Sequence, residues 1–111
     1  MKWKILGSGG CQVIPKPLCS CTVCTQARTK GVPYSRTGPS AYLHDIGLLI
    51  DTPAEVSTQL NHSNIARVDH LMFTHLDPDH SEGFRVVEQI ALDFRTWSAY
   101  LEKRISLIVP D

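Results

Sequence analysis

The feature that most constrains the fold is a short polar segment enclosed between two apolar segments of different periodicity. The run Val68–Phe73 predicts a strand that leads into Thr74. After the polar segment, apolar side chains recur at steps of three and four, which predicts an amphipathic helix packed on a core: Phe84, Val87, Ile90, Ala91, Phe94, Trp97 and Leu101. Between the two lies His75-Leu76-Asp77-Pro78-Asp79-His80. A strand, a turn and a helix in this order indicate an α/β fold.

Further secondary structure is predicted on both sides of this unit. Short apolar runs bounded by turn residues predict four more strands, at Trp3–Leu6, Ala41–His44, Leu48–Asp51 and Ile105–Val109. Asp45-Ile46-Gly47 joins the middle two tightly and predicts a hairpin. Thr52 as N-cap and Pro53 as first helical residue predict a helix that ends near Asn61–Asn64. The resulting order, β-ββ-α-β-α-β, predicts a layered α/β fold whose sheet needs cover on both faces.

Length and composition narrow the class of protein. The chain has 111 residues, which is one domain at most, and it is 42% hydrophobic and 20% charged, as expected of a globular protein. Its longest apolar runs are far shorter than the roughly 18 residues that a membrane helix needs. The N-terminus lacks the apolar core of a signal peptide, which favours a cytoplasmic protein with no membrane partner.

The formal net charge is zero, which disfavours a general nucleic-acid binder, but the charges are unevenly distributed. The stretch Met1–His44 carries six basic residues and no acidic one, whereas the stretch Asp45–Asp111 carries five basic and eleven acidic residues. Two halves that attract each other would explain this pattern. A basic rim for an anionic substrate, beside an acidic pocket that needs cations, would explain it equally.

The segment Gln12–Pro39 has no sustained period, so we expect a long structured loop tied down by cysteines. Cys19-x-Cys21-x-x-Cys24 places three soft ligands on a short stretch, which suits a tetrahedral structural zinc. A redox dithiol and unliganded thiols are the alternatives. The fourth ligand could be Cys11 or a distant histidine. Cys11 itself is better explained as a small buried hydrophobic residue.

The polar segment after the Val68–Phe73 strand has four metal-ligand residues among its six. In an extended backbone, residues two apart project to one side, so His75 and Asp77 can meet one ion. Pro78 keeps Asp77 out of helical angles, and the turn then directs Asp79 and His80 toward a second ion. The position also fits, because ligands of α/β proteins bind at the carboxyl ends of strands.

Helix capping and ordinary turn chemistry offer a simpler explanation of the acidic residues. Asp79 followed by Glu82 three residues later resembles a capping arrangement, and Asp-Pro-Asp is a common turn sequence. Capping does not require the two flanking histidines. The whole pattern therefore favours metal binding.

These residues resemble a known family. His75-x-Asp77-x-Asp79-His80, placed after Thr74, resembles the H-x-H-x-D-H signature of the metallo-β-lactamase superfamily. Leu49-Ile50-Asp51-Thr52 looks like the strand of that family that ends in Asp, and Leu6-Gly7-Ser8-Gly9 looks like its opening strand and turn. The cysteine insertion is shared by a narrower branch that includes phosphoribosyl cyclic phosphodiesterases.

The resemblance implies a fold and a set of ligands. The chain would form the N-terminal half of an αββα metallo-β-lactamase-type sandwich, as one partial domain over residues 1–111 with a zinc-binding insertion at about 11–36. His75 and Asp77 would bind a first metal, and Asp79, the expected catalytic residue, and His80 a second. Asp51 would support the metal loop, although a strand-end Asp that binds turn amides is the alternative. The thiolates of Cys19, Cys21 and Cys24 would hold a structural zinc, whose fourth ligand in the phosphodiesterase is a C-terminal His.

The chain departs from the family pattern in two ways. Asp77 replaces the second His of the motif; its harder oxygen could favour manganese or iron over zinc, or leave the first site weak. The remaining family ligands would lie beyond the region equivalent to Ile105–Asp111. His44, His62 and His70 do not lie where those ligands belong and are expected to be surface or strand histidines.

The resemblance predicts two-metal hydrolysis of a cyclic phosphate or another small phosphodiester, with Zn, Mn or Fe at the catalytic site. Lys30 and Arg36 are the candidate phosphate contacts. With two protein donors for each ion, we expect weak metal binding and little hydrolysis from this chain alone, because a catalytic zinc usually has three. A C-terminal half or a homodimer partner would complete the site. A non-enzymatic zinc-binding module and a thiol redox protein are the rival functions.

Overall fold

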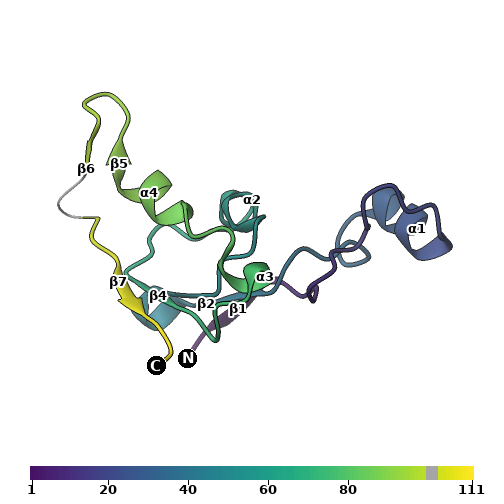
Figure 1. The fold of residues 1–111 in the computed structure, drawn as a ribbon, viewed down its shortest axis with the longest axis horizontal. Helices are drawn as coiled ribbons and strands as arrows, with labels where there is room; N and C mark the ends of the chain where they lie inside the picture. Colours follow the sequence, from purple (N-terminus) through teal and green to yellow (C-terminus); the bar gives the residue numbers. More distant parts are fainter. Residues whose placement is uncertain (100–102) are drawn as a thin grey trace.

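In the computed structural model, a mixed sheet carries the helices that position the polar segment (Figure 1). The structure describes residues 1–99 and 103–111. The strands are β1 (Trp3–Gly7), β2 (Ser40–Leu43), β3 (Leu48–Ile50), β4 (His70–Met72), β5 (Leu92–Asp93), β6 (Ser98–Ala99) and β7 (Ser106–Ile108). The α-helices are α1 (Thr22–Lys30), α2 (Val56–Asn61), α3 (Pro78–Ser81) and α4 (Val86–Ala91), and a 3-10 turn, η1, spans His44–Ile46.

The main sheet has the strand order β1-β2-β3-β4-β7. The pairs β1–β2 and β2–β3 are antiparallel, whereas β3–β4 and β4–β7 are parallel. The predicted hairpin between β2 and β3 is present, and it turns through η1 and Gly47, whose φ is 62°. Because β3 and β4 run in parallel, their carboxyl ends reach the same edge of the sheet, where Asp51 and Thr74 follow them.

One face of the sheet carries the core. Tyr42, Leu49 and Leu71 lie opposite one another across three neighbouring strands and are almost fully buried. They form one cluster with Val56 of α2 and Val86 of α4. Figure 1 shows α2 and α4 on the same side of the sheet. Side-chain alternation along the strands thus places the core beneath these two helices.

The other face differs from the sequence expectation of a sheet covered on both sides. Side chains that alternate with the core positions point to this face. On the outer strands Trp3, Ile5 and Ile108 are 50%, 66% and 48% exposed, whereas Leu43 and Leu48 on the inner strands are buried. No helix formed by residues 1–99 or 103–111 lies on this side of the sheet in Figure 1. Within the described chain, the sheet is therefore an open two-layer structure.

The predicted helix from Phe84 to Leu101 is wrong over most of its length. The helix α4 ends at Ala91, and β5 pairs with β6 in a hairpin over residues 92–99. The chain leaves the helix at Leu92, which is extended with φ −88° and ψ 126°, and it turns at Asp93, whose carbonyl accepts from the N–H groups of Thr96 and Trp97 at 3.3 and 2.8 Å. Phe94 and Trp97 are exposed, so their three-residue spacing does not mark a core face. Leu101 lies outside the described residues.

The helix expected from Pro53 begins three residues later, at Val56, and Thr52 is not its N-cap. Thr52 is fully buried; its N–H donates to the carbonyl of His80 at 2.7 Å, and its carbonyl accepts from Gly83 N–H at 2.8 Å. Tertiary contact with the polar segment thus replaces local capping. The helix nevertheless ends at Asn61, within the predicted range.

The segment expected as a long loop contains the helix α1 and forms an arm that projects from the sheet (Figure 1). The base of the arm is closed by paired backbone bonds between Ile14 and Arg36, at 2.9 and 2.6 Å. Gly31 ends α1 with a φ of 68°, a conformation that glycine adopts without strain. In the described part of the chain, every helix is too short or too polar to cross a bilayer.

Candidate metal centre

The polar segment His75–His80, called the elbow below, turns sharply where α3 begins. Asp77 is extended, with φ −61° and ψ 149°, and Pro78 is the first helical residue. The carbonyl of Asp77 accepts from the N–H groups of His80 and Ser81 at 2.9 and 3.1 Å, whereas its side chain makes no capping bond. Asp79 lies within α3 rather than before it. Capping therefore does not explain the acidic side chains of the elbow.

Three of the expected ligands converge. One donor atom from each of His75, Asp79 and His80 lies within 4.8 Å of the other two. The imidazole centroids of His75 and His80 are 3.9 Å apart. Nε2 of His80 lies 3.3 Å from Oδ2 of Asp79, and Nε2 of His75 lies 3.5 Å from Oδ2 of Asp77. The expected division of the ligands into His75 with Asp77 and Asp79 with His80 is thus not sharp, because His75 lies close to members of both pairs.

Asp51 anchors the elbow from the end of β3. Its carboxylate is buried and accepts three hydrogen bonds, from Thr74 N–H at 2.8 Å, from Thr74 Oγ1 at 2.7 Å and from Nδ1 of His80 at 2.8 Å. Both expectations for Asp51 describe part of this network, since it binds a turn amide and also holds a candidate ligand. Its φ of 60° is unusual for a residue other than glycine and marks a conformation that the surrounding structure imposes.

The donor set suits a divalent cation. Imidazole nitrogens and carboxylate oxygens are ligands of Zn, Mn and Fe. Donor atoms around a tetrahedral zinc lie about 3.4 Å apart, so small side-chain rotations would bring His75, Asp79 and His80 onto one ion. Asp77 has the most exposed side chain of the four, at 74%, and is free to turn toward the same place. The residues therefore fit a metal centre.

The second cluster lies on the arm. Cys19, Cys21 and Cys24 have their sulfur atoms within 4.8 Å of one another. Cys21 caps α1, with Sγ accepting from Cys24 N–H at 3.4 Å, and Cys24 Sγ accepts from Lys16 N–H at 3.3 Å. Nη1 of Arg28 donates to the carbonyl of Cys19 at 2.6 Å and holds this loop on α1. The spacing in the sequence thus becomes a three-thiol pocket at the start of a helix.

These contacts set the thiols apart chemically. The N–H of Cys24, followed by the side chains of Cys19 and Cys24, lowers the pKa of Cys21 to about 7. At Cys24, the hydrogen bond from Lys16 N–H lowers the pKa. Burial and the thiols of Cys21 and Cys19 raise it by more, so the pKa of Cys24 is raised overall. Cys11 is exposed and lies outside the cluster, so the expectation of a buried residue there is wrong. It follows a glycine turn on the surface and packs into no core.

Two solved structures are similar to this chain in fold. The chain resembles a diphosphatase described as a new member of the PhnP family, with a TM-score of 0.72 and 27% sequence identity over 95% of the chain. It also resembles Zn²⁺-bound PqqB from Methylobacterium extorquens, with a TM-score of 0.73 and 17% identity over 98% of the chain. Both structures are members of the metallo-β-lactamase superfamily, so the likeness supports the resemblance drawn from the sequence. It spans 39% of the length of the first structure and 49% of the second. Comparison with family models gives no match, and neither does comparison with curated proteins.

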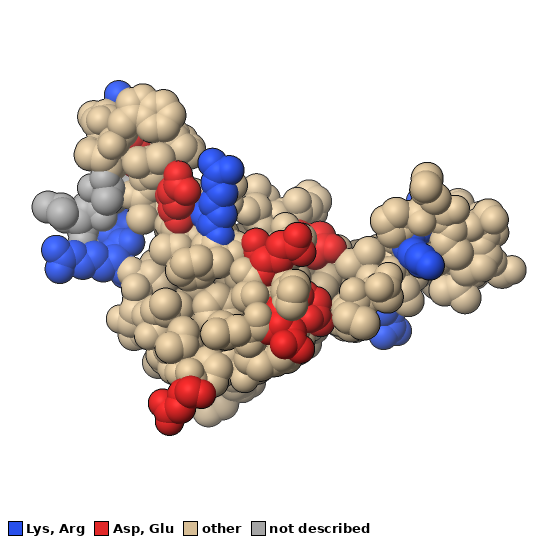
Figure 2. All heavy atoms as spheres, in the orientation of Figure 1, with Lys and Arg blue, Asp and Glu red and all other residues tan. Residues whose placement is uncertain are grey.

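The predicted phosphate contacts lie on the arm. Lys30 is the last residue of α1, and its Nζ lies 4.7 Å from the ring centroid of Tyr34. Arg36 lies at the base of the arm, in the pairing with Ile14. Figure 1 shows α1 well separated from α3, and Figure 2 shows the arm's basic side chains apart from a group of acidic ones. The structure therefore places Lys30, at the end of α1, away from the elbow.

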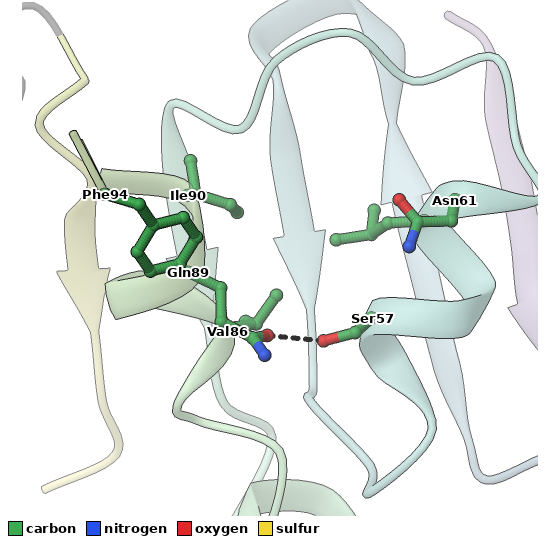
Figure 3. A pocket seen from close by; sticks show the side chains of 7 residues that line it. Ser57, Asn61, Val86, Gln89, Ile90 and Phe94 are labelled. Carbon is green, nitrogen blue, oxygen red and sulfur yellow. Dashed lines mark hydrogen bonds between the residues drawn. The ribbon is translucent and has the colours of Figure 1, made fainter. Parts of the chain in front are cut away.

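The remaining histidines and the groove on the helical side add no donors to the elbow. His70 lies in β4, His62 is exposed after α2, and His44 packs edge-on against Tyr42. A groove between α2 and α4 is bridged by a 2.5 Å hydrogen bond from Ser57 Oγ to Gln89 Oε1 (Figure 3). Its described lining has no ionisable side chain. The elbow is therefore the better candidate site.

Sequence reasoning missed Thr74 as a member of the site. Its hydroxyl lies 3.0 Å from Nδ1 of His75 and 2.7 Å from Asp51. The only signal in the sequence is its position, directly between the apolar strand and the first histidine. Thr52 was missed for a similar reason, since its bond to His80 of the elbow uses backbone atoms, as does the bond that it accepts from Gly83 N–H.

Proposed function

We propose that this chain forms the metal-binding part of a metal-dependent hydrolase that acts on a small phosphodiester or cyclic phosphate. The observation that carries the proposal is the convergence of His75, Asp79 and His80 at the carboxyl end of β4, held by buried Asp51. The likeness to a diphosphatase supports a phosphate-containing substrate. The negative charge of a phosphate group also suits a site that binds divalent cations.

The roles of the residues follow from their contacts. His75, Asp79 and His80 would hold a divalent cation, with Asp77 beside His75. A bound cation would lower the pKa of a water molecule and so supply the nucleophile. Asp51 keeps Nδ1 of His80 engaged, which leaves Nε2 directed toward Asp79. Asp79 is the carboxylate closest to the Nε2 side of His80, and we assign it the catalytic role.

We further propose that the elbow takes Zn, Mn or Fe, and two ions when the site is complete. Four donors from one segment leave two for each ion, so weak metal binding and little hydrolysis are expected from these residues alone. A C-terminal half or a second copy of the chain would supply the other donors. The open face of the sheet, with Trp3 and Ile5 exposed, offers a surface for that partner.

On the arm, we propose a structural zinc held by Cys19, Cys21 and Cys24. Three thiols at the start of α1, one of them with a lowered pKa, form a soft donor set. Lys30 and Arg36 stay candidates for contacts to the phosphate of a substrate that reaches the arm. A cytoplasmic location agrees with free thiols in a cluster of this kind.

A second candidate function is a non-enzymatic zinc module, which the cysteine cluster alone would support. The two functions differ in the number and kind of metal sites. A hydrolase requires a thiolate site and an oxygen–nitrogen site, whereas the module requires only the first. Reversible oxidation of the thiols without bound metal would instead indicate a redox protein.

Metal counting tests the proposal. The chain is purified in zinc- and manganese-replete buffer, and bound metal is measured by mass spectrometry for the wild type and for a variant with His75→Ala and His80→Ala. We expect the variant to lose the oxygen–nitrogen site and to keep the thiolate-bound zinc. A matched control with His62→Ala and His70→Ala should keep both. Full metal stoichiometry in the first variant would show that the hydrolase assignment is wrong.

A further inference from the structure

The side chain of Thr74 lies at a junction of three groups of the elbow although it is not itself an expected ligand. Its Oγ1 lies 2.7 Å from Oδ2 of Asp51, 3.0 Å from Nδ1 of His75 and 3.4 Å from Nδ1 of His80. Its N–H donates to Oδ1 of Asp51 at 2.8 Å. One exposed hydroxyl thus links the buried carboxylate to both imidazoles.

The number of protons on each group decides which atom donates and which accepts in every hydrogen bond of this network. The carboxylate of Asp51 can only accept, and the hydroxyl of Thr74 has a single proton to donate. The short bond between them uses that proton. Toward His75, the hydroxyl oxygen can then only accept, so the ring proton of His75 lies on Nδ1. A neutral imidazole carries one N–H, which leaves the lone pair of His75 on Nε2.

His80 reaches the same state by a direct route. Its Nδ1 lies 2.8 Å from Oδ2 of Asp51, closer than its 3.4 Å distance to Thr74, and donates its proton to the carboxylate. One oxygen atom of Asp51 therefore orients both rings, directly for His80 and through a hydroxyl for His75. In each ring the free Nε2 faces a carboxylate of the elbow, Asp77 for His75 and Asp79 for His80.

We propose that Thr74 is a positioning residue that connects Asp51 to His75 and holds the tautomer in which Nε2 of His75 can bind a divalent cation. The identity of the positioned ligand rests on the proposed function, whereas the proton arrangement exists without a metal. The effect depends on the hydroxyl alone. Valine has nearly the shape of threonine and no hydroxyl, and serine has the hydroxyl and less bulk, so Thr74→Val and Thr74→Ser form a matched pair.

The tautomers are measured by nitrogen-15 NMR of the histidine rings in the metal-free full chain, at a pH above the usual range of imidazole titration. In the wild type and T74S, we expect His75 to carry its proton on Nδ1. In T74V, the Nε2–H form of His75 should become populated. His80 serves as an internal control, because its direct bond to Asp51 keeps its tautomer in all three proteins. Thr74→Ala repeats the deletion with less bulk should T74V fold poorly.

Manganese titration of the same proteins provides the second measurement, since Mn²⁺ prefers oxygen and nitrogen donors to thiolates. Removing an outer partner of a metal ligand typically weakens binding about 10- to 100-fold. We expect that loss for T74V and near-wild-type affinity for T74S. An unchanged His75 tautomer in T74V, loss in T74S equal to that in T74V, or a changed tautomer with unchanged manganese affinity would each overturn the proposal. A wild type that binds no manganese would instead refute the proposed metal site, and the tautomers would still decide the proton arrangement.

Discussion

The two candidate metal centres differ in how far along the chain their supporting contacts reach. On the arm, the bonds that shape the cysteine cluster join residues 3 to 12 positions apart, from Cys21–Cys24 to Lys16–Arg28. At the elbow, the bonds from Asp51 to Thr74 and His80 join residues 23 and 29 positions apart. A site made by local contacts can form on its own, whereas the elbow exists only when β3 and β4 are paired.

Burial of the anchoring groups follows the same contrast. Asp51, which holds the elbow, is only 4% exposed and follows a central strand of the sheet. Cys21, which caps α1 on the arm, is exposed. Substitution of Asp51 should therefore lower the free energy of unfolding of the whole domain, whereas substitutions on the arm should destabilise only the arm.

The largest expected effect is that of Asp51→Asn. The amide keeps the size of the side chain and tolerates a positive φ, but it turns an NH₂ group toward Thr74 or His80, where a donor is already present. Hydrogen bonds to a charged group contribute about 1.5–3 kcal/mol, so the free energy of unfolding should fall by about 2–3 kcal/mol. Urea denaturation followed by circular dichroism measures this change.

Asp45→Asn provides the matched control. Asp45 is exposed; it accepts a hydrogen bond from Lys2 N–H at 2.8 Å, and its Oδ2 lies 3.8 Å from the N-terminal amine. Its replacement should change the free energy of unfolding by less than about 1 kcal/mol. Equal effects of the two variants would remove the contrast between a buried anchor and an exposed one.

A smaller and more local effect is expected from Cys24→Ala. The variant removes one of three thiols and should abolish binding of the zinc proposed for the arm, while the urea transition of the sheet shifts little. Zinc content and limited proteolysis, with cleavage expected within residues 12–39, measure the two effects. Cys11→Ala is the control, since Cys11 is exposed and outside the cluster. Cooperative loss of the sheet in Cys24→Ala would show that the arm and the sheet unfold together.

The smallest expected effect is a difference in thiol reactivity with pH. With the pKa of Cys21 lowered to about 7, its thiolate forms above that pH, so alkylation of the metal-free chain should reach half its maximal rate near pH 7. The thiolate form stabilises the folded arm, and this contribution is lost as the pH falls through about 7. Peptide mapping after iodoacetamide treatment measures the midpoint.

The variant Cys24→Ala provides a control for this measurement, because it removes the thiol and keeps the backbone N–H. Cys24→Ala keeps the N–H of residue 24, which is the largest cause of the lowered pKa, so most of the shift of Cys21 should survive. Cys24 in the wild type, with its raised pKa, should react only at higher pH. A midpoint for Cys21 near 9, the usual value for a thiol, would contradict the assigned geometry.

The sequence predicted best where short-range patterns decide the outcome. The strands Trp3–Gly7 and Leu48–Ile50 and the hairpin through Gly47 lie within a residue or two of their predicted positions. Apolar runs bounded by turn residues mark them. The family resemblance, carried by the elbow and the Asp51 strand, is confirmed by the two structural matches.

The errors arose where hydrogen bonds, tertiary in one case and local in the other, overrode the expected helical pattern. Thr52 has the residue type of an N-cap, yet its backbone bonds to His80 and Gly83 keep it out of the helix. The apolar spacing of Phe94 and Trp97 continued a helical pattern, yet the chain becomes extended at Leu92 and turns at Asp93. At Thr52 bonds to a distant segment, and at Asp93 the bonds of a local turn, outweigh a helix propensity that amounts to less than about 1 kcal/mol per residue.

By itself, the sequence determined the class of the fold, the order of most strands and the identity of the candidate ligands, because side-chain period and ligand chemistry are properties of short segments. The tertiary structure decided which of those ligands meet and how they are held. His75, Asp79 and His80 converge on one place, and Asp51 and Thr74 orient their imidazoles, because two parallel strands bring residues more than twenty positions apart within hydrogen-bonding distance. That pairing depends on burying the core between sheet and helices, and no local pattern in the chain encodes it.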